Sequence, residues 1–194
     1  MSRVERNPQE TQKKILDAAT EEFKEHGPHG ARIDQIISKA GVNKRMIYHY
    51  FNDKAGLFEA VMKREIEEIN GILAESPRKS PFDDMRYWHS KNQELDSFLK
   101  LCCWVDSNRD DDVVAQNERE DIFKQSAEVY RQMQKDGKIP KGIDPKFFLL
   151  AVMSISAFPM VVPKLAKIVT GHEFESDEFE KKYMKVIKKL LDFE

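Results

Sequence analysis

The sequence predicts an all-α fold in which a small N-terminal three-helix unit precedes a larger helical portion. Apolar residues recur at helical spacing along the chain, and no segment shows a competing strand pattern. Glycine and proline residues fall where helices are expected to stop, as at Gly27-Pro28 and Gly41. With 194 residues, 40% of them hydrophobic and 34% charged, the chain is long enough to bury a core in one large or two small domains.

The first helix is expected to begin at Pro8. Asn7 is a helix-capping residue, and proline suits the first helical position because its missing N–H has no partner there. Glu10 lies where a capping box places its reciprocal acceptor. The helix should run to His26 and stop at Gly27-Pro28.

Two short helices are expected next, over Ile33–Ala40 and Lys44–Phe51. Gly41 lies between them and is free to adopt the positive φ that a tight turn requires. The apolar residues that fall on inward faces at helical spacing are Ile33, Ile36, Ile37, Ala40, Ile47 and Phe51. This pattern is typical of a helix-turn-helix, whose second helix enters the major groove of DNA.

The second helix of this pair carries basic and aromatic residues. Because its apolar residues point inward, Arg45 and His49 point away from the core, while Lys44 and Tyr48 line one flank. Two cations in the first turn are unfavourable, because the helix dipole places a partial positive charge there. An anionic partner would therefore explain their presence better than a role in stabilising the helix. The alternative is that these residues form only a solvated face.

The expected DNA contacts fall into two groups. Lysine and arginine pair with guanine O6 and N7, and tyrosine hydroxyls suit phosphate oxygens. Arg45 is the strongest single candidate for base readout. The net charge is −2, but between Gly27 and Gly56 five basic residues face only two acidic ones. We expect base contacts from Lys44, Arg45 and His49, phosphate contacts from Arg32, Tyr48, Tyr50 and Lys54, and a helix cap and candidate contact from Asn43.

The run IIxKAGVNKRMIYHYFNDKAGLF, with ILDAATEEFKEHG before it, resembles the DNA-binding signature of the tetracycline-repressor (TetR) family over about Ile15 to Phe58. The resemblance implies a transcription regulator that is released from DNA by a small molecule. There are two departures from the family pattern. Ala31 and Arg32 stand where threonine or serine often caps the helix, and Ile37 stands where a small alanine is commoner.

The chain is expected to divide into a helix-turn-helix domain over residues 1–53 and an effector-binding and dimerisation domain over residues 54–194. Asp53 should cap a long fourth helix that ends between Gly71 and Pro77. By resemblance, movement of this helix would change the placement of the DNA-reading unit. Further helices are expected at about Phe82–Ser90, Glu94–Ser107, Val113–Lys135, Pro145–Val169 and Glu178–Phe193.

An apolar run over Phe147–Val162 is too short to span a membrane, which takes about 20 apolar residues. Because it is apolar all round, we expect it to pack on its own domain and on a partner. A helix-turn-helix usually binds as a dimer to two half-sites about 34–36 Å apart. The expected interface between two copies consists of Phe148, Val152, Ile155, Pro159, Phe179, Tyr183, Ile187, Leu190 and Leu191. The alternative is that these residues only close the core of one subunit.

A small-molecule cavity is expected by resemblance to the family. Two tryptophans and several methionines suit an apolar, roughly planar ligand. The alternative is that these side chains are simply core. The candidate lining residues are Trp88, Leu99, Cys103, Trp104, Phe123, Tyr130, Met133 and Met153.

Other chemistry has little support in the sequence. No catalytic motif is present, so we expect neither an enzyme nor a cofactor. His26 and His29 make an incomplete metal site, and the adjacent Cys102 and Cys103 are more typical of small buried residues than of a redox sensor. We expect a reduced, cytoplasmic location, with no signal peptide and no membrane partner.

The sequence therefore predicts a homodimeric, sequence-specific DNA-binding transcription regulator, with repression favoured over activation. It is expected to bind an operator of approximate two-fold symmetry and a small-molecule effector. Two alternatives remain. One is a non-specific architectural DNA-binding protein, and the other is an all-helical binding protein for apolar ligands in which the helix-turn-helix only packs.

Overall fold

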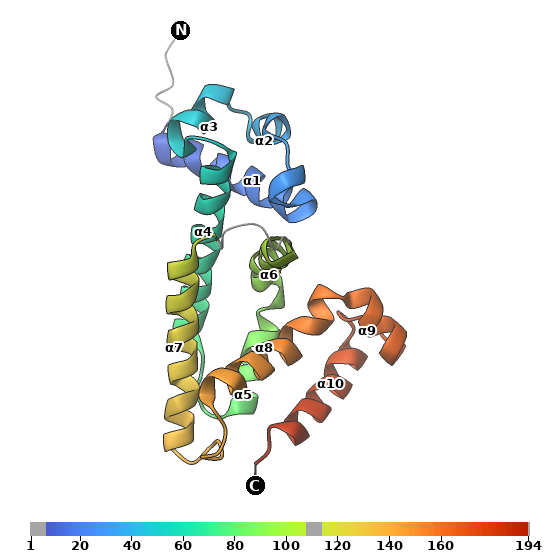
Figure 1. The fold of residues 1–194 in the computed structure, drawn as a ribbon. Coiled ribbons are helices and arrows are strands. Elements are labelled where there is room, and N and C mark those ends of the chain that lie inside the picture. Colours follow the sequence, from blue (N-terminus) through green and yellow to red (C-terminus); the bar gives the residue numbers. More distant parts are fainter. Residues whose placement is uncertain (1–6, 108–113, 194) are drawn as a thin grey trace. The chain divides into compact units, whose positions relative to one another are not determined.

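The computed structural model describes residues 7–107 and 114–193 (Figure 1). This part of the chain contains ten helices and no strand. The helices are α1 (Pro8–Gly30), α2 (Ile33–Ala40), α3 (Lys44–Phe51), α4 (Lys54–Glu75), α5 (Pro81–Ser90), α6 (Asn92–Ser107), α7 (Gln116–Lys135), α8 (Pro145–Val161), α9 (Pro163–Thr170) and α10 (Asp177–Leu190). The all-α prediction is confirmed.

Most helix boundaries follow from local capping. The side chain of Asn7 accepts a hydrogen bond from the amide of Gln9, and Asp144 accepts one from the amide of Lys146. Asp53 likewise accepts from the amide of Gly56 at 2.8 Å, which confirms it as the cap of α4. The bounds of α2 and α3 agree with the prediction. Val113, where α7 was expected to begin, lies outside the described residues.

The chain forms two compact units. The first unit consists of Met1–Glu68 with Ser97–Glu118, and the second unit of Ile69–Asp96 with Arg119–Glu194. This division differs from the predicted boundary after residue 53 because the first half of α4 belongs to the core of the helix-turn-helix. Leu57 and Val61 are fully buried, and the Phe58 ring lies 4.9 Å from that of Phe23 on α1. The functional division into a DNA-binding domain over residues 1–53 and an effector-binding domain over residues 54–194 stays a prediction.

In the first unit α1 is interrupted at Gly27. The backbone there has φ 70° and ψ 173°, a region open essentially to glycine alone. The indole of Trp104 on α6 lies against this glycine and donates its N–H to the carbonyl oxygen of Lys24 at 3.2 Å. The predicted break at Gly27-Pro28 is therefore confirmed, although one further helical turn follows it.

The core of the second unit surrounds a buried hydrogen-bonded group. The Asp84 carboxylate accepts hydrogen bonds from the hydroxyls of Ser76 and Tyr130, the latter at 2.6 Å. Burial, together with the neighbouring Asp84, raises the pKa of Tyr130 well above its ordinary value. The apolar side chains of the core are Met85, Tyr130, Met133, Ile139, Phe148, Val152, Ile187 and Leu191.

The single helix predicted over Pro145–Val169 is wrong, because the chain breaks into α8 and α9, which are bent by 92°. Pro163 has no N–H to continue the helix, and Val162 before it leaves the helical region with ψ 60°. Among the described residues no single helix is long and apolar enough to cross a membrane, and only the bent pair α8 and α9 taken together reaches that length.

Pro159 also lies in this segment but does not break α8. Without an N–H at Pro159, the carbonyl of Ile155 lacks its usual helical donor. The hydroxyl of Tyr183 on α10 donates to that carbonyl at 2.7 Å and replaces the missing bond. Tyr183 therefore links α10 to α8 and compensates for the proline.

We expect Tyr183→Phe to lower the free energy of unfolding by about 1–2 kcal/mol, because it leaves the Ile155 carbonyl without a donor. Pro159→Ala supplies a backbone N–H for the same carbonyl, so Tyr183→Phe should cost less in that background. Urea unfolding of the four proteins of this double-mutant cycle measures the difference. An equal cost in both backgrounds would contradict the assignment.

Candidate nucleic-acid interface

The helix-turn-helix is formed by α2, the turn at Gly41 and α3. Gly41 adopts a left-handed conformation with φ 64°, and its amide donates to the carbonyl of Ile37 at 2.9 Å. Asn43 caps α3 by accepting a hydrogen bond from the amide of Arg45 at 3.0 Å, as predicted. Ile36 and Ile47 are completely buried and hold the two helices together.

The side chains on the outer face of α3 are accessible. Lys44, Arg45, Tyr48 and His49 are exposed, and Tyr50 is half-buried with its ring 5.0 Å from that of His49. The structure thus brings five predicted DNA contacts together on one short helix. Such a face can offer several N–H and O–H donors to base edges and phosphates.

Lys44 has a partner that the sequence analysis did not identify. Its ammonium lies 3.0 Å from a carboxylate oxygen of Asp34, in the first turn of α2. This hydrogen bond and the charge of Asp34 raise the pKa of Lys44. Because both side chains are exposed, the pair is weak and open to exchange with a phosphate. No local spacing rule connects these two residues, so periodicity could not reveal the pair.

Lys54 is tied to the end of α1. Its ammonium donates hydrogen bonds to the carbonyl oxygens of His29 at 3.0 Å and Ala31 at 3.3 Å. Two of its three N–H groups therefore hold the connection between α1 and α2, and one is left for another acceptor. A phosphate contact from Lys54 stays a prediction, and the structure adds a second role in bracing the loop beside Arg32.

Arg32 occupies the N-cap position of α2, and its side chain makes no capping hydrogen bond. Its backbone N–H donates to Glu22, a buried carboxylate on α1 that also binds the Lys39 ammonium at 3.1 Å. Burial would raise the pKa of Glu22, but the hydrogen bonds from Arg32 and Lys39 outweigh it, so the pKa is lowered. Glu22 thus fixes the start of α2 and leaves the exposed guanidinium of Arg32 for another partner.

The residues predicted to line an effector cavity lie in several places. Leu99, Cys103 and Trp104 belong to the first unit, and the other five belong to the second. Of these, Phe123 and Met153 line a pocket of about 430 Å³ between α7 and α8, whereas Met133 lines a pocket of about 610 Å³ beside α4 and α7. Tyr130 is a core residue, and Trp88 is half-buried on α5.

Cysteine chemistry and metal binding gain no support from the geometry. Cys102 is buried, and partial burial together with nearby Asp106 raises the pKa of the Cys103 thiol, which disfavours the reactive thiolate. Among the described residues, no group of three or more His, Cys, Asp and Glu side chains is placed to hold a metal ion.

The predicted dimer residues lie mostly inside one subunit. Phe148, Val152, Ile187 and Leu191 are buried in the core of the second unit, as are Phe179 and Pro159. Ile155 and Tyr183 are half-buried and joined by their hydrogen bond, and Leu190 is exposed. Most of the expected interface residues therefore lie on the faces of α8 and α10 that pack within one chain, and a contact with a second copy stays a prediction.

Comparison with known proteins agrees with this geometry. Residues 15–61 match the family described as bacterial regulatory proteins, tetR family. The HTH-type transcriptional repressor SCO4008 of Streptomyces coelicolor is 29% identical over 174 residues, which cover 86% of each chain.

Two solved structures have the same fold. The putative transcriptional regulator SCO4942 from Streptomyces coelicolor aligns with a TM-score of 0.74 and 21% identity over 93% of this chain and 97% of that one. AibR in complex with isovaleryl coenzyme A and operator DNA aligns with a TM-score of 0.69 and 12% identity, also over 93% and 97%.

Fold and site together define a helix-turn-helix DNA-binding protein with a helical C-terminal portion. More narrowly, its helix-turn-helix region matches the TetR family of bacterial regulatory proteins, and the chain is a DNA-binding transcription regulator.

Proposed function

We propose that this protein is a repressor that binds its operator as a homodimer and leaves it when a small-molecule effector binds. The observation that carries the proposal is the capped helix α3, whose exposed face gathers Lys44, Arg45 and His49 beside Tyr48. Repression is supported by the similarity to a protein named as a transcriptional repressor. The fold shared with AibR, whose structure holds both an acyl coenzyme A and operator DNA, supports control by an effector. Such a protein would act in the cytoplasm, where DNA is accessible.

In this proposal the side chains have distinct roles. Arg45 reads a base through its guanidinium, with Lys44 and His49 beside it. Phosphate contacts from Arg32, Tyr48, Tyr50 and Lys54 set the register of the helix on DNA without reading sequence. Asp34 competes with DNA for Lys44, since the Lys44 ammonium is paired with it in the free protein.

The proposed dimer contact is the exposed apolar surface of α8 and α10. Phe147 is 72% exposed and Phe158 is 56% exposed, with Leu150 between them on the same face of α8. Val186 and Leu190 are exposed on α10. An exposed cluster of this many apolar side chains is typical of an interaction surface. Two copies of α8 and α10 would bury them in a four-helix contact.

The test is in vitro selection from random DNA, followed by gel-shift titration at two salt concentrations and sedimentation of the complex. We expect a selected site with approximate two-fold symmetry, bound by two subunits and preferred over random duplex by about 10³-fold or more. Equal affinity for selected and random DNA would favour a non-specific architectural protein. No DNA binding at either salt concentration would favour a ligand-binding protein in which the helix-turn-helix only packs.

A further inference from the structure

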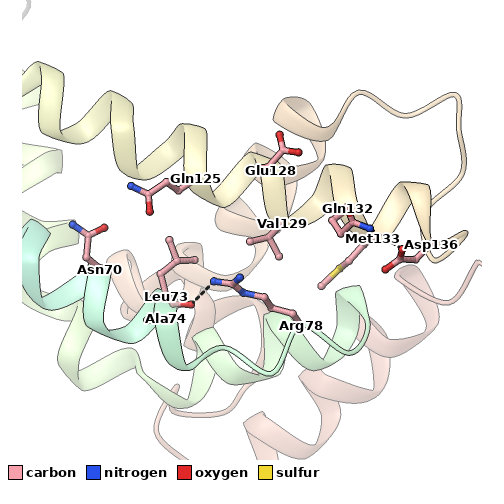
Figure 2. A pocket seen from close by; sticks show the side chains of 10 residues that line it. All are labelled: Asn70, Leu73, Ala74, Arg78, Gln125, Glu128, Val129, Gln132, Met133 and Asp136. Atoms are coloured by element: carbon pink, nitrogen blue, oxygen red, sulfur yellow. Dashed lines mark hydrogen bonds between the residues drawn. The ribbon is translucent and has the colours of Figure 1, made fainter.

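A groove between α4 and α7 in the second unit has the features of a binding site for an organic anion. It has a volume of about 610 Å³, within the range of pockets that hold small molecules (Figure 2). All of its lining residues belong to the second unit. The groove opens at the surface, where Asn70 and Gln125 place amide groups at one end.

The floor of the groove is aliphatic. Leu73 on α4 and Met133 on α7 are buried, and Val129 is half-buried between the two helices. These side chains offer an elongated apolar strip rather than a flat aromatic wall. The body of a ligand that fits the strip would be an alkyl chain or a similar aliphatic group.

Arg78 supplies a cation above this floor. Its backbone has φ 51°, which is unusual for a residue with a side chain, and its guanidinium donates one hydrogen bond to the carbonyl of Leu73 at 3.1 Å. This bond holds the guanidinium between α4 and α7, as Figure 2 shows. No carboxylate of the described residues forms an ion pair with it, so its remaining N–H groups are available to a ligand.

The two carboxylates of the groove are already engaged. Glu128 is paired with Arg131 at 2.6 Å, and Asp136 accepts a hydrogen bond from Gln132 at 2.8 Å. Lys135 lies 4.0 Å from the other oxygen of Glu128. Three cations therefore accompany two carboxylates around the groove, and Arg78 is the cation without an acidic partner.

We propose that this groove binds an amphipathic organic carboxylate, whose charged group is held by Arg78 and whose aliphatic body lies along Leu73, Val129 and Met133. A guanidinium matches a carboxylate with two parallel hydrogen bonds, which favours a carboxylate over a neutral or cationic head group. The inference rests on the proposed function, because it gives the expected effector a chemical class and a site.

The test uses the full chain and calorimetric titration without DNA. The first probe is decanoate, used below its critical micelle concentration. The controls are decan-1-ol and decylamine, which have a chain of the same length but a neutral and a cationic head group. We expect decanoate to bind at least tenfold more tightly than either of these two compounds. Arg78→Gln should remove that preference while leaving the weaker binding of decan-1-ol unchanged. Arg86→Gln, which alters an exposed arginine of the same unit, is the control and should leave decanoate binding intact.

A second variant tests the floor without disturbing the core. Ala74 is exposed and lines the groove, so Ala74→Glu places a negative charge beside the apolar strip and should weaken decanoate binding at least tenfold. The proposal is overturned if decanoate does not bind, if Arg78→Gln binds it as tightly as the natural protein, or if decylamine binds more tightly. A gel shift with the selected DNA separates the two proposals. Decanoate that binds the groove without releasing DNA supports the site and overturns this ligand class as the effector.

Discussion

Gly27→Ala is expected to lower the free energy of unfolding by about 2–6 kcal/mol. Part of the loss is backbone strain of about 1–3 kcal/mol, because the φ and ψ angles of Gly27 are open essentially to glycine alone. The rest is steric, because the new Cβ would lie 2.7 Å from Cε3 of Trp104, and overpacking of this kind costs about 1–3 kcal/mol. Urea unfolding measures the change.

Two further variants separate these contributions. Gly30→Ala is a matched control at the end of the same helix, where the new Cβ would lie 3.5 Å from the Cβ of His26 in ordinary contact, so it should be neutral or slightly stabilising. In a Trp104→Ala background the steric part disappears, and Gly27→Ala should cost only the strain. A loss no larger than that of Gly30→Ala, or an equal loss with and without Trp104, would refute the packing argument.

Trp104 illustrates what the sequence could and could not reveal. The HGPHG motif predicts a helix break correctly, because the conformational freedom of glycine and the restraint of proline act locally. The partner that fills the space beside Gly27 comes from α6, far along the chain, and no periodicity links the two. The same side chain was predicted to line an effector cavity. The structure places it against α1 in the first unit, where it lines a pocket of about 590 Å³ beside Glu22 and Arg32, and its role toward an effector stays a prediction.

The helix predictions likewise succeed where the cause is local and fail where it is a contact between distant parts of the chain. The caps at Asn7, Asn43 and Asp53 need only neighbouring residues, and all three are confirmed. Pro159 and Pro163 lie four residues apart in one apolar run, yet only the second breaks the helix. The outcome at Pro159 depends on the Tyr183 hydroxyl from α10, which is a tertiary contact.

Burial of the C-terminal helices also depends on tertiary structure. Periodicity identifies α8 as apolar on more than one face, but it contains no information on which face the same chain covers. The structure resolves this, because Phe148 and Val152 are buried while Phe147 and Leu150 beside them are exposed. Glu22 was missed for a related reason, since a buried carboxylate that holds α2 has no signature in the sequence of α1.

Arg45→Ala is expected to weaken binding to the selected operator by about 1–3 kcal/mol, which corresponds to about 5- to 150-fold in affinity. The side chain is exposed on the outer face of α3, where its guanidinium can form two hydrogen bonds with a guanine edge. Binding to random DNA should change less, so the ratio of specific to non-specific affinity falls. Gel-shift titrations on both duplexes at several salt concentrations measure this ratio.

Arg32→Ala is the matched control, because it removes the same charged group from the start of α2, where the backbone rather than the side chain bonds to Glu22. A phosphate contact carries no sequence information, so this variant should weaken both duplexes alike and reduce the slope of log affinity against log salt by about 1. If Arg45→Ala and Arg32→Ala lower both affinities equally, Arg45 is a phosphate contact and base recognition must lie with Lys44 or His49. A loss of specificity confined to Arg45→Ala would instead place base reading on the first turn of α3, which Asn43 caps.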